Sequence, residues 1–227
     1  MSTNSYFDYA PLIRKFVEER RIPYLCHFTR QANLSSILTH GLLSVETLSA
    51  RSIPFIETDR TRLDHAPSAI SLSISFPNYR MFSAYRNAQS DPCTWVVLVI
   101  HSSVLWEKRC QFADMNAASQ RAQDMWARCD PDPVRSFRNL FAENVRDSNG
   151  KLYRRKDLAI PPFFPTNPQA EVLVYGSIEP DCVIEVHFES EGCIHRFRDS
   201  FGSGSTARRY LASPRFFQPR QDWHHWR

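Results

Sequence analysis

The chain has 227 residues, of which 42% are hydrophobic and 23% charged, and its formal net charge is +4 at pH 7. These values are typical of one globular domain with a small extension, and they exclude a disordered chain. Glycine is scarce, with 6 residues, and neither GxGxxG nor GxxxxGK[ST] occurs, which argues against Rossmann-type and P-loop nucleotide binding.

Membrane, secretory and metal-binding functions find no support in the sequence. No apolar run reaches about 18 residues, and residues 1–10 lack the basic and apolar regions of a secretory signal. The six cysteines include no CxxC pair. We therefore predict no metal or redox site and interpret the cysteines as free thiols in a reducing cytoplasm.

The basic residues are 24 arginines and only 4 lysines. Arginine binds phosphate bidentately and stacks on bases, so this bias indicates a nucleic-acid or pyrophosphate partner. A GC-rich genome that encodes basic residues as arginine explains the bias equally well, and both explanations stay open here.

The first third of the chain predicts a helix, a strand and a second helix. Residues 9–20 are amphipathic, and residues 22–28 predict a strand. Asn33 is a plausible N-cap for a helix that Gly41 ends in a left-handed conformation. Residues 44–69 lack periodicity and predict a long irregular loop, which is often functional in a compact domain.

The rest of the chain predicts short strands and few helices. Residues 71–76 alternate as in a half-buried strand, and Asn78 is placed to cap the helix that follows. Further strands are predicted at residues 94–101, 171–175 and 183–188. Residues 111–150 are expected to be partly helical, and residues 159–168, with four prolines, irregular. No alternating βαβ rhythm occurs, so the fold class is α+β.

The last residues, 196–227, form a distinct basic and aromatic tail. They carry seven arginines against two acidic residues. The interleaved aromatic residues are Phe197, Phe201, Tyr210, Phe216, Phe217, Trp223 and Trp226. Such alternation suits single-stranded nucleic acid, because phosphates meet arginine and bases stack on rings. The other explanation is a tail whose aromatic side chains dock on the core.

Three short segments carry candidate chemistry. His27 and Thr29 share one face of a strand that ends close to Asn33, where a helix begins. Asp59-Arg60-Thr-Arg62 brings arginines into the loop, and Gln169-Ala-Glu171 brings a carboxylate to the mouth of an apolar strand. Each segment taken alone also has a structural explanation: a structural strand histidine, a solvated charged turn and a polar strand edge.

In order and spacing, these segments resemble the DarT family of DNA ADP-ribosyltransferase toxins. The similar segments are Leu25-Cys-His-Phe-Thr-Arg-Gln-Ala-Asn33 with Ile37-Leu38 and Gly41-Leu-Leu43, Ser75-Phe-Pro77 with Met81, and Gln169-Ala-Glu-Val-Leu-Val-Tyr175. The tail and residues 105–150 carry little of the likeness. We therefore expect an ADP-ribosyltransferase domain over residues 1–195 and a basic, aromatic-rich extension over residues 196–227.

The resemblance implies an ADP-ribosyltransferase fold, in which a split antiparallel β-sheet core with flanking helices binds NAD⁺ as co-substrate. It implies that His27 and Thr29 hold the ribose and amide of NAD⁺ and that Asn33 assists. By the same likeness, Glu171 is the catalytic carboxylate, and Gln169 orients the acceptor.

The family also uses a catalytic arginine in the loop after the first helix. Arg60 is the closest match, with Arg62 and Arg51 as rivals, and a contact with the NAD⁺ pyrophosphate or the target base is expected of this arginine. Many members carry an Asp-Tyr-Val-Pro-Phe-Tyr-Phe run that this chain lacks; residues 64–76 stand there instead. The resemblance therefore does not determine which arginine is catalytic or which base is modified.

The acceptor implied by the resemblance is a nucleobase of single-stranded DNA, on which Tyr79, Phe82 or Phe164 is expected to stack. A transferase of this kind is toxic, so an antitoxin with macrodomain hydrolase activity is the expected partner. The alternatives are the same fold acting on RNA or protein, and a non-catalytic nucleic-acid binding module.

Overall fold

The computed structural model describes residues 5–57, 66–88, 91–119, 132–147, 149–201 and 209–226. The α-helices are α1 (Ala10–Arg20), α2 (Leu34–His40), α3 (Val45–Ala50), α4 (Tyr79–Asn87), α5 (Val104–Glu107), α7 (Pro133–Asn139) and α8 (Glu191–Phe201). The strands are β1 (Leu25–Arg30), β2 (Ala69–Ile74), β3 (Trp95–Ile100), β4 (Arg109–Ala113), β5 (Asn144–Arg146), β6 (Leu152–Arg154), β7 (Glu171–Tyr175), β8 (Val183–Phe188) and β9 (Arg209–Ala212). Within these ranges no helix is long and apolar enough to cross a membrane.

Seven strands form one sheet in the order β4-β7-β2-β1-β3-β8-β9, and β5 and β6 form a separate hairpin. Neighbours in the large sheet run antiparallel, except for the parallel pair of β8 and β9. The central pair, β1 and β2, shares only two aligned positions, Leu25 with Ile74 and Cys26 with Ser73. Beyond them each strand continues with its outer neighbour, so the sheet is split, as the resemblance implies.

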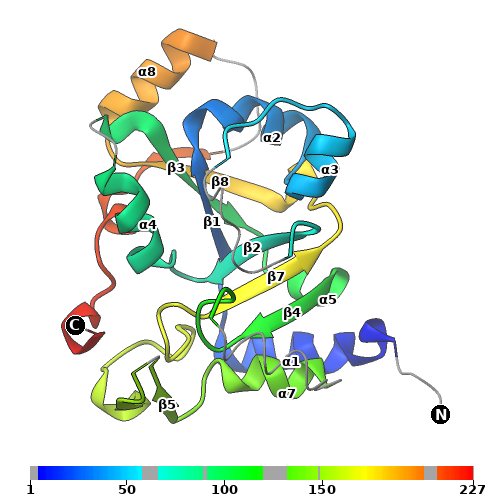
Figure 1. The fold of residues 1–227 in the computed structure, drawn as a ribbon, viewed down its shortest axis with the longest axis vertical. Coiled ribbons are helices and arrows are strands. Elements are labelled where there is room, and N and C mark those ends of the chain that lie inside the picture. Colours follow the sequence, from blue (N-terminus) through cyan, green and yellow to red (C-terminus); the bar gives the residue numbers. More distant parts are fainter. Residues whose placement is uncertain are drawn as a thin grey trace.

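The helices cover different regions of this sheet (Figure 1). Helices α1, α5 and α7 lie together at one end, while α2 and α3 lie near the split and α4 lies beside β1. The main core fills the space between the sheet and α1, α2, α7 and α8, because each of these helices buries an apolar stripe there. A second, mostly aromatic cluster lies between the sheet and α4.

Several predicted strands lie where the sequence pattern put them. The strand predicted at residues 171–175 is β7, and the one at residues 183–188 is β8. The apolar run predicted at residues 94–101 is β3, which is buried along its whole length. These segments were predictable because their apolar content is continuous and their ends are marked by proline, glycine or polar residues.

Two other predictions were incomplete. The loop predicted at residues 44–69 contains α3, which begins because the Ser44 hydroxyl accepts a hydrogen bond from the Thr47 amide at 3.2 Å. The partly helical region predicted at residues 111–150 contains α7, but also the end of β4 and the strand β5. Strands of three to five residues are stabilised by their partners, and their own sequence carries little periodicity.

The cysteines are not all free thiols, contrary to the sequence-based expectation. Cys93 and Cys193 form a disulfide that joins positions 100 residues apart, while Cys26, Cys110 and Cys182 are free. Cys129 lies outside the described residues. The disulfide was missed because pairing depends on tertiary proximity, which the spacing of isolated cysteines does not reveal.

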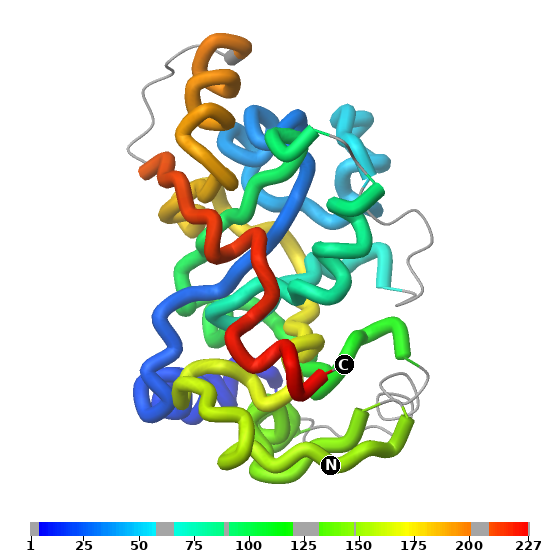
Figure 2. The backbone as a smooth tube through the Cα atoms, turned by 90° about the vertical axis from the view of Figure 1, so that its left-hand side faces the viewer, coloured from blue at the N-terminus to red at the C-terminus, as the bar shows by residue number. Residues whose placement is uncertain are grey.

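The basic tail continues the fold instead of leaving it. The boundary predicted between residues 195 and 196 falls inside α8, and β9 then joins the sheet. Figure 2 shows the rest of the tail running along the side of the molecule toward residues 150–165. Four of its aromatic side chains are at most 6% exposed: Phe197, Phe216, Phe217 and Trp226. For these rings, docking on the core is the correct explanation, whereas Trp223 is 38% exposed.

A buried histidine links β8 to the tail. The His187 ring is 2% exposed, with Nδ1 2.7 Å from the Ser213 hydroxyl and Nε2 2.9 Å from a Glu185 carboxylate oxygen. Burial lowers the pKa of His187 below its usual value; the Glu185 carboxylate acts in the opposite direction, and nearby arginines add to the lowering.

This histidine makes stability pH-dependent. The folded pKa is lowered, so the unfolded chain binds the proton more readily. The contribution is complete above about pH 6.5 and is lost as the pH falls through the folded pKa. We expect thermal unfolding scans to show a decline below pH 6.5 that is weaker in His187→Gln and unchanged in His40→Gln, at an exposed position. An equal decline in His187→Gln would contradict this assignment.

Candidate active site

A cavity of about 190 Å³ opens where β1 and β2 separate. Its walls come from β1, β2, α2, α3, the start of α4, the first residue of β7 and the segment after β4. It brings together His27, Thr29, Asn33 and Glu171, which are far apart in the sequence. Split strands expose polar side chains and backbone groups that a continuous ladder would occupy, which makes this seam suited to binding a ligand.

Glu171 is the carboxylate of this cavity. It is the first residue of β7, pairs with Ala113 of β4 and is only 5% exposed. Its Oε1 accepts a hydrogen bond from Asn78 Nδ2 at 3.2 Å, and its Oε2 accepts one from the Ala117 amide at 3.3 Å. Both oxygens are therefore held, and the side chain has a fixed direction inside a partly apolar pocket.

Asn78 has two roles at once. Its Oδ1 caps α4 by accepting a hydrogen bond from the Met81 amide, while its Nδ2 donates to Glu171. Its own amide donates to the Ser73 hydroxyl at 3.1 Å, and the residue is 1% exposed. The sequence predicted the cap but not the contact with Glu171. The sequence feature that could have indicated a role of Asn78 in the site is its position directly after the Ser75-Phe-Pro77 segment.

Substitutions at Asn78 separate these two roles. Asn78→Asp keeps an oxygen for the cap but brings a second carboxylate to within about 3 Å of Glu171, and like charges at that distance disfavour the ionised form. Asn78→Ser keeps a capping oxygen, but its shorter side chain withdraws the Nδ2 donor from Glu171. We expect transferase activity in the order wild type, Asn78→Ser, Asn78→Asp, with a loss of about 100-fold or more in the last.

The measurement is the initial rate of NAD⁺-dependent transfer, taken alongside thermal unfolding. Asn78→Ser should unfold within a few degrees of the wild type, because the helix cap survives. Asn78→Asp should unfold at a lower temperature, because its buried carboxylate faces Glu171, so its rate is compared well below that temperature. Equal activity of Asn78→Asp and the wild type would remove Asn78 from the positioning of Glu171.

His27 spans the split in the sheet. Its Nδ1 lies 2.9 Å from the backbone oxygen of Ser71 on β2. A carbonyl oxygen only accepts, so Nδ1 carries the proton, and in the neutral ring Nε2 is the acceptor. The histidine thus has both a structural contact and a defined tautomer at the cavity wall.

Asn33 is not the helix cap that the sequence predicted. Its backbone is already helical and its side chain makes no capping bond, because a 3₁₀ turn, η2 (Gln31–Asn33), precedes α2. The amide group instead binds the backbone of Ile56 twice, at 2.9 and 2.7 Å, and donates to the Thr29 hydroxyl at 3.2 Å. Asn33 therefore attaches the rim segment around Ile56 to the cavity.

Four predicted substrate contacts lie outside the cavity lining. Gln169 is in the turn before β7, which begins only at Glu171, and it lies outside the cavity lining. Tyr79 is 8% exposed at the start of α4. Phe164 packs against Phe76 and lies under the Arg220 guanidinium, also outside the cavity. Phe82 is 2% exposed and stacks on Phe28.

Of the three arginines predicted in the loop, the structure describes only Arg51. Arg60 and Arg62 lie outside the described residues. Arg51 directly follows α3 and is exposed.

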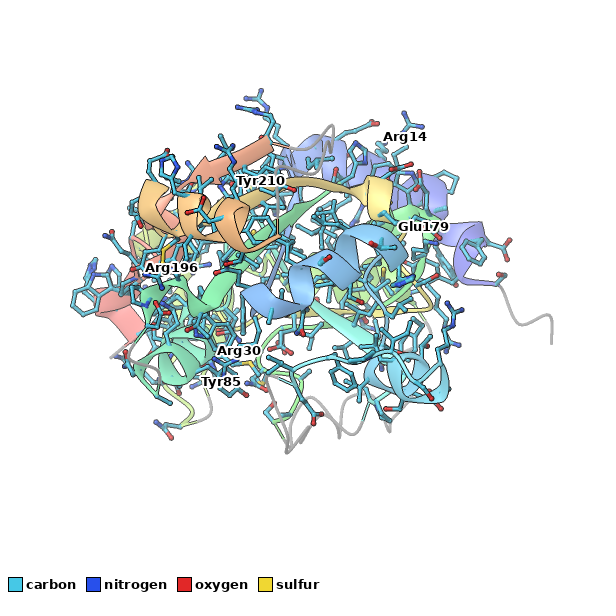
Figure 3. All side chains as sticks on the ribbon, turned by 90° about the horizontal axis from the view of Figure 1, so that it is seen from above. Arg14, Arg30, Tyr85, Glu179, Arg196 and Tyr210 are labelled. Carbon is cyan, nitrogen blue, oxygen red and sulfur yellow. A yellow bond between two sulfur atoms is a disulfide. The ribbon has the colours of Figure 1, made fainter. Side chains whose placement is uncertain are left out.

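Arg30, the last residue of β1, was not singled out by the sequence. Its guanidinium lies 4.0 Å from the centre of the Trp95 ring, which Tyr85 also contacts (Figure 3). Burial lowers the pKa of Arg30.

The cavity also contains a thiol that is poorly suited to nucleophilic chemistry. Cys26 lines the wall, and burial raises the pKa of its thiol far above the usual range. Because the thiolate is the nucleophile, this cysteine stays unreactive near neutral pH. The arrangement around it, a fixed carboxylate facing hydrogen-bonding groups across a cleft, suits stabilisation of a developing positive charge.

Known proteins share this arrangement of strands. Thermus sp. 2.9 DarT in complex with ADP-ribosylated ssDNA superposes with a TM-score of 0.55 at 15% identity, over 87% of this chain and 97% of that chain. The same protein in complex with NAD⁺ gives 0.50 at 15% identity, over 87% and 98%. Thermosipho africanus DarTG in complex with ADP-ribose gives 0.55 at 14%, over 86% of this chain and 51% of that one, so the chain spans about half its length. Comparison with curated proteins gives no match.

At these identities the solved structures establish the fold, which is that of the ADP-ribosyltransferases. The sequence goes further, because the family model described as "ssDNA thymidine ADP-ribosyltransferase, DarT" matches residues 26–218. The chain belongs to the DarT family. His27, Asn78 and Glu171 all lie within the matched residues.

Proposed function

We propose that the protein transfers ADP-ribose from NAD⁺ to a thymidine base of single-stranded DNA and that Glu171 is its catalytic carboxylate. The observation that carries this proposal is the buried Glu171 side chain, held by Asn78 and the Ala117 amide in the cleft of the split sheet. The family description supplies the acceptor, and the NAD⁺ and ADP-ribosylated ssDNA complexes of the Thermus protein support both substrates.

The cleft suggests how NAD⁺ is held. Its volume of about 190 Å³ is below the roughly 300–1,000 Å³ of most ligand pockets, so its described walls accommodate part of NAD⁺, and we assign this part to the nicotinamide–ribose end. His27 Nε2 and the Thr29 hydroxyl are the groups we assign to the ribose and the carboxamide. Asn33 acts indirectly, since its amide already binds Thr29 and Ile56.

The proposed reaction breaks the bond between nicotinamide and ribose and forms one between ribose and a base nitrogen. The bonding electrons leave with nicotinamide, and the ribose carbon becomes positively charged as it does so. The Glu171 carboxylate stabilises that charge and accepts the proton that the thymine ring nitrogen loses when it attacks. A dry, prearranged carboxylate is effective here because the surrounding dielectric is low.

The loop arginines complete the proposal. We assign Arg60 a catalytic contact and Arg62 a contact with the NAD⁺ pyrophosphate, on the family likeness alone. Arg51→Ala, Arg60→Ala and Arg62→Ala, compared in one transfer assay, test this choice. The arginine whose loss lowers the rate most takes the catalytic assignment.

The function is tested by incubating the protein with NAD⁺ and single-stranded oligonucleotides that differ only in one central base, with mass spectrometry as the readout. Transfer confined to the oligonucleotide with thymidine supports the proposal. Matched RNA and a total protein extract form the other arms. Modification of RNA or protein in place of DNA overturns the acceptor, and binding without NAD⁺ consumption overturns the enzyme.

We further propose that the enzyme acts in the cytoplasm, where NAD⁺ and single-stranded DNA occur together, and that an antitoxin with macrodomain hydrolase activity reverses its product. Family membership supports both points. Induced expression in a bacterial host should stop growth, and Glu171→Gln should not. Normal growth with the active wild type would contradict the need for an antitoxin.

A further inference from the structure

The proline-rich segment that leads to Glu171 lacks the usual means of pairing its backbone. Residues 159–168 contain four prolines, which have no N–H to donate, and they form no strand or helix. Five of the carbonyl oxygens in this segment are bound by arginine side chains: those of Pro161, Pro162, Phe164, Pro165 and Thr166. The conformation of the segment therefore depends on guanidinium groups from outside it.

Arg155 supplies the first of these groups. It follows β6 in a 3₁₀ turn and is 8% exposed. Its guanidinium donates to the carbonyls of Pro161, Pro162 and Phe164 at 2.8–3.1 Å and to the Thr166 hydroxyl at 3.0 Å. Burial lowers the pKa of Arg155 to about 10, so the group remains charged at neutral pH.

Arg220 supplies the second group, and it comes from the C-terminal segment, residues 214–226. It is 2% exposed and donates to the carbonyls of Pro165 at 2.9 Å and Thr166 at 3.1 Å. The other edge of its guanidinium binds both oxygens of Asp222, at 2.6 and 2.7 Å. Asp222 is 1% exposed and also accepts from the Trp226 indole at 2.8 Å.

The C-terminal segment also has anchors outside the proline-rich segment. At one end, Phe216 and Phe217 belong to the aromatic cluster under α4, and Arg86 of that helix donates to the Phe217 carbonyl. At the other end, Trp226 stacks on Tyr153 of the hairpin with ring centres 4.1 Å apart. Arg220 therefore belongs to a segment that is fixed on both sides of it.

From Thr166 the path to the carboxylate is short and hydrogen-bonded. Asn167 accepts from the Gln169 amide through its side chain and from the Ala170 amide through its carbonyl, at 2.9 and 3.1 Å. Ala170 is buried, and Glu171 follows directly. A displacement at Thr166 would be transmitted along this turn to the start of β7.

We propose that Arg220 is a positioning residue for Glu171 and that the C-terminal segment serves to fix the proline-rich segment from which the catalytic strand begins. This inference rests on the proposed function of Glu171. A misplacement of about 1 Å at a reacting group can cost about 100-fold in rate, so the effect of Arg220 falls on turnover. Binding of NAD⁺ should change little, because His27 and Thr29 lie on β1, across the cleft.

The test is Arg220→Lys, which keeps the charge but loses the planar fork that binds Asp222 and two carbonyls together. We expect kcat for transfer to fall about 10–100-fold, with KM for NAD⁺ within about twofold of the wild type. His224→Ala, an exposed change in the same segment, should leave both values unchanged. Ile13→Ala, on the buried face of α1, should lower the unfolding temperature without lowering kcat in assays well below that temperature.

Hydrogen exchange gives a readout that does not depend on activity. Peptides covering residues 161–175 should exchange faster in Arg220→Lys than in the wild type, and not in His224→Ala; in Ile13→Ala any increase should be spread over the core strands and not confined to these residues. Unchanged exchange, or wild-type kcat in Arg220→Lys, overturns the inference. An inactive wild type would instead overturn the proposed function, and the exchange result would then still decide whether Arg220 fixes the segment.

Discussion

Replacing Glu171 with glutamine should lower the rate of ADP-ribose transfer by at least about 100-fold while the protein stays folded. Glutamine has nearly the same shape but no negative charge, so it neither stabilises the developing ribose cation nor accepts the proton. Glutamine also carries one oxygen and one N–H₂ group, so it cannot accept from both Asn78 and the Ala117 amide as the carboxylate does. One of these two donors loses its partner.

The measurement is single-turnover transfer to a thymidine oligonucleotide, with calorimetry of a non-hydrolysable NAD⁺ analogue on the same samples. Analogue affinity should remain within a few-fold of the wild type. Glu46→Gln, an exposed carboxylate in the first turn of α3, is the matched control and should transfer normally. Full activity of Glu171→Gln would leave the carboxylate without a catalytic role.

Removing the Cys93–Cys193 disulfide should cost about 2–5 kcal/mol of folding free energy. The bond closes a loop of 100 residues, and long loops lose the most chain entropy when they are closed. It holds α8 to the chain just before β3, where Asp91 and Arg196 also form a two-point ion pair (Figure 3). For a chain of this size the loss corresponds to about 5–15 °C in Tm.

The experiment compares the wild type with Cys93→Ala/Cys193→Ala, each scanned with and without a thiol reductant. The reductant should lower the Tm of the wild type toward that of the double variant and leave the double variant unchanged. The bond would contribute nothing to stability if two results held together. The Tm of the wild type would be unchanged after prolonged reduction in a partly unfolding buffer, and it would equal the Tm of the double variant.

The sequence predicted the parts of the site that lie in contiguous segments. The strand that carries His27 and Thr29 and the strand that starts at Glu171 both have apolar patterns with clear ends, so their side chains could be assigned to strand faces. The family likeness then related the two segments. The split of the sheet also followed from that likeness, and no periodicity in the sequence indicates it.

Contacts between distant residues could not be predicted in this way. Asn78 and Glu171 are 93 residues apart, and Cys93 and Cys193 are 100 apart. Such pairs are set by the order of strands in the sheet, which local pattern does not encode. Gln169 shows the limit at a strand end, because β7 begins only at Glu171 and strand alternation does not fix the direction of a side chain in the preceding turn. The sequence counts Arg220 and Asp222 among the charges of the tail and does not reveal that the two side chains pair in the interior.

The short pairing between β1 and β2 has a consequence for the substrate itself. The two halves of the sheet share two aligned positions, the His27 contact and the bond from the Ser75 amide to the Tyr24 carbonyl, so few backbone hydrogen bonds join them where NAD⁺ is proposed to bind. A molecule that contacts both walls replaces the backbone bonds that the strands do not make. Bound NAD⁺ would then stabilise the contact between the two halves of the sheet during each turnover. The enzyme would become more rigid when NAD⁺ binds and less rigid when nicotinamide and the modified DNA have left.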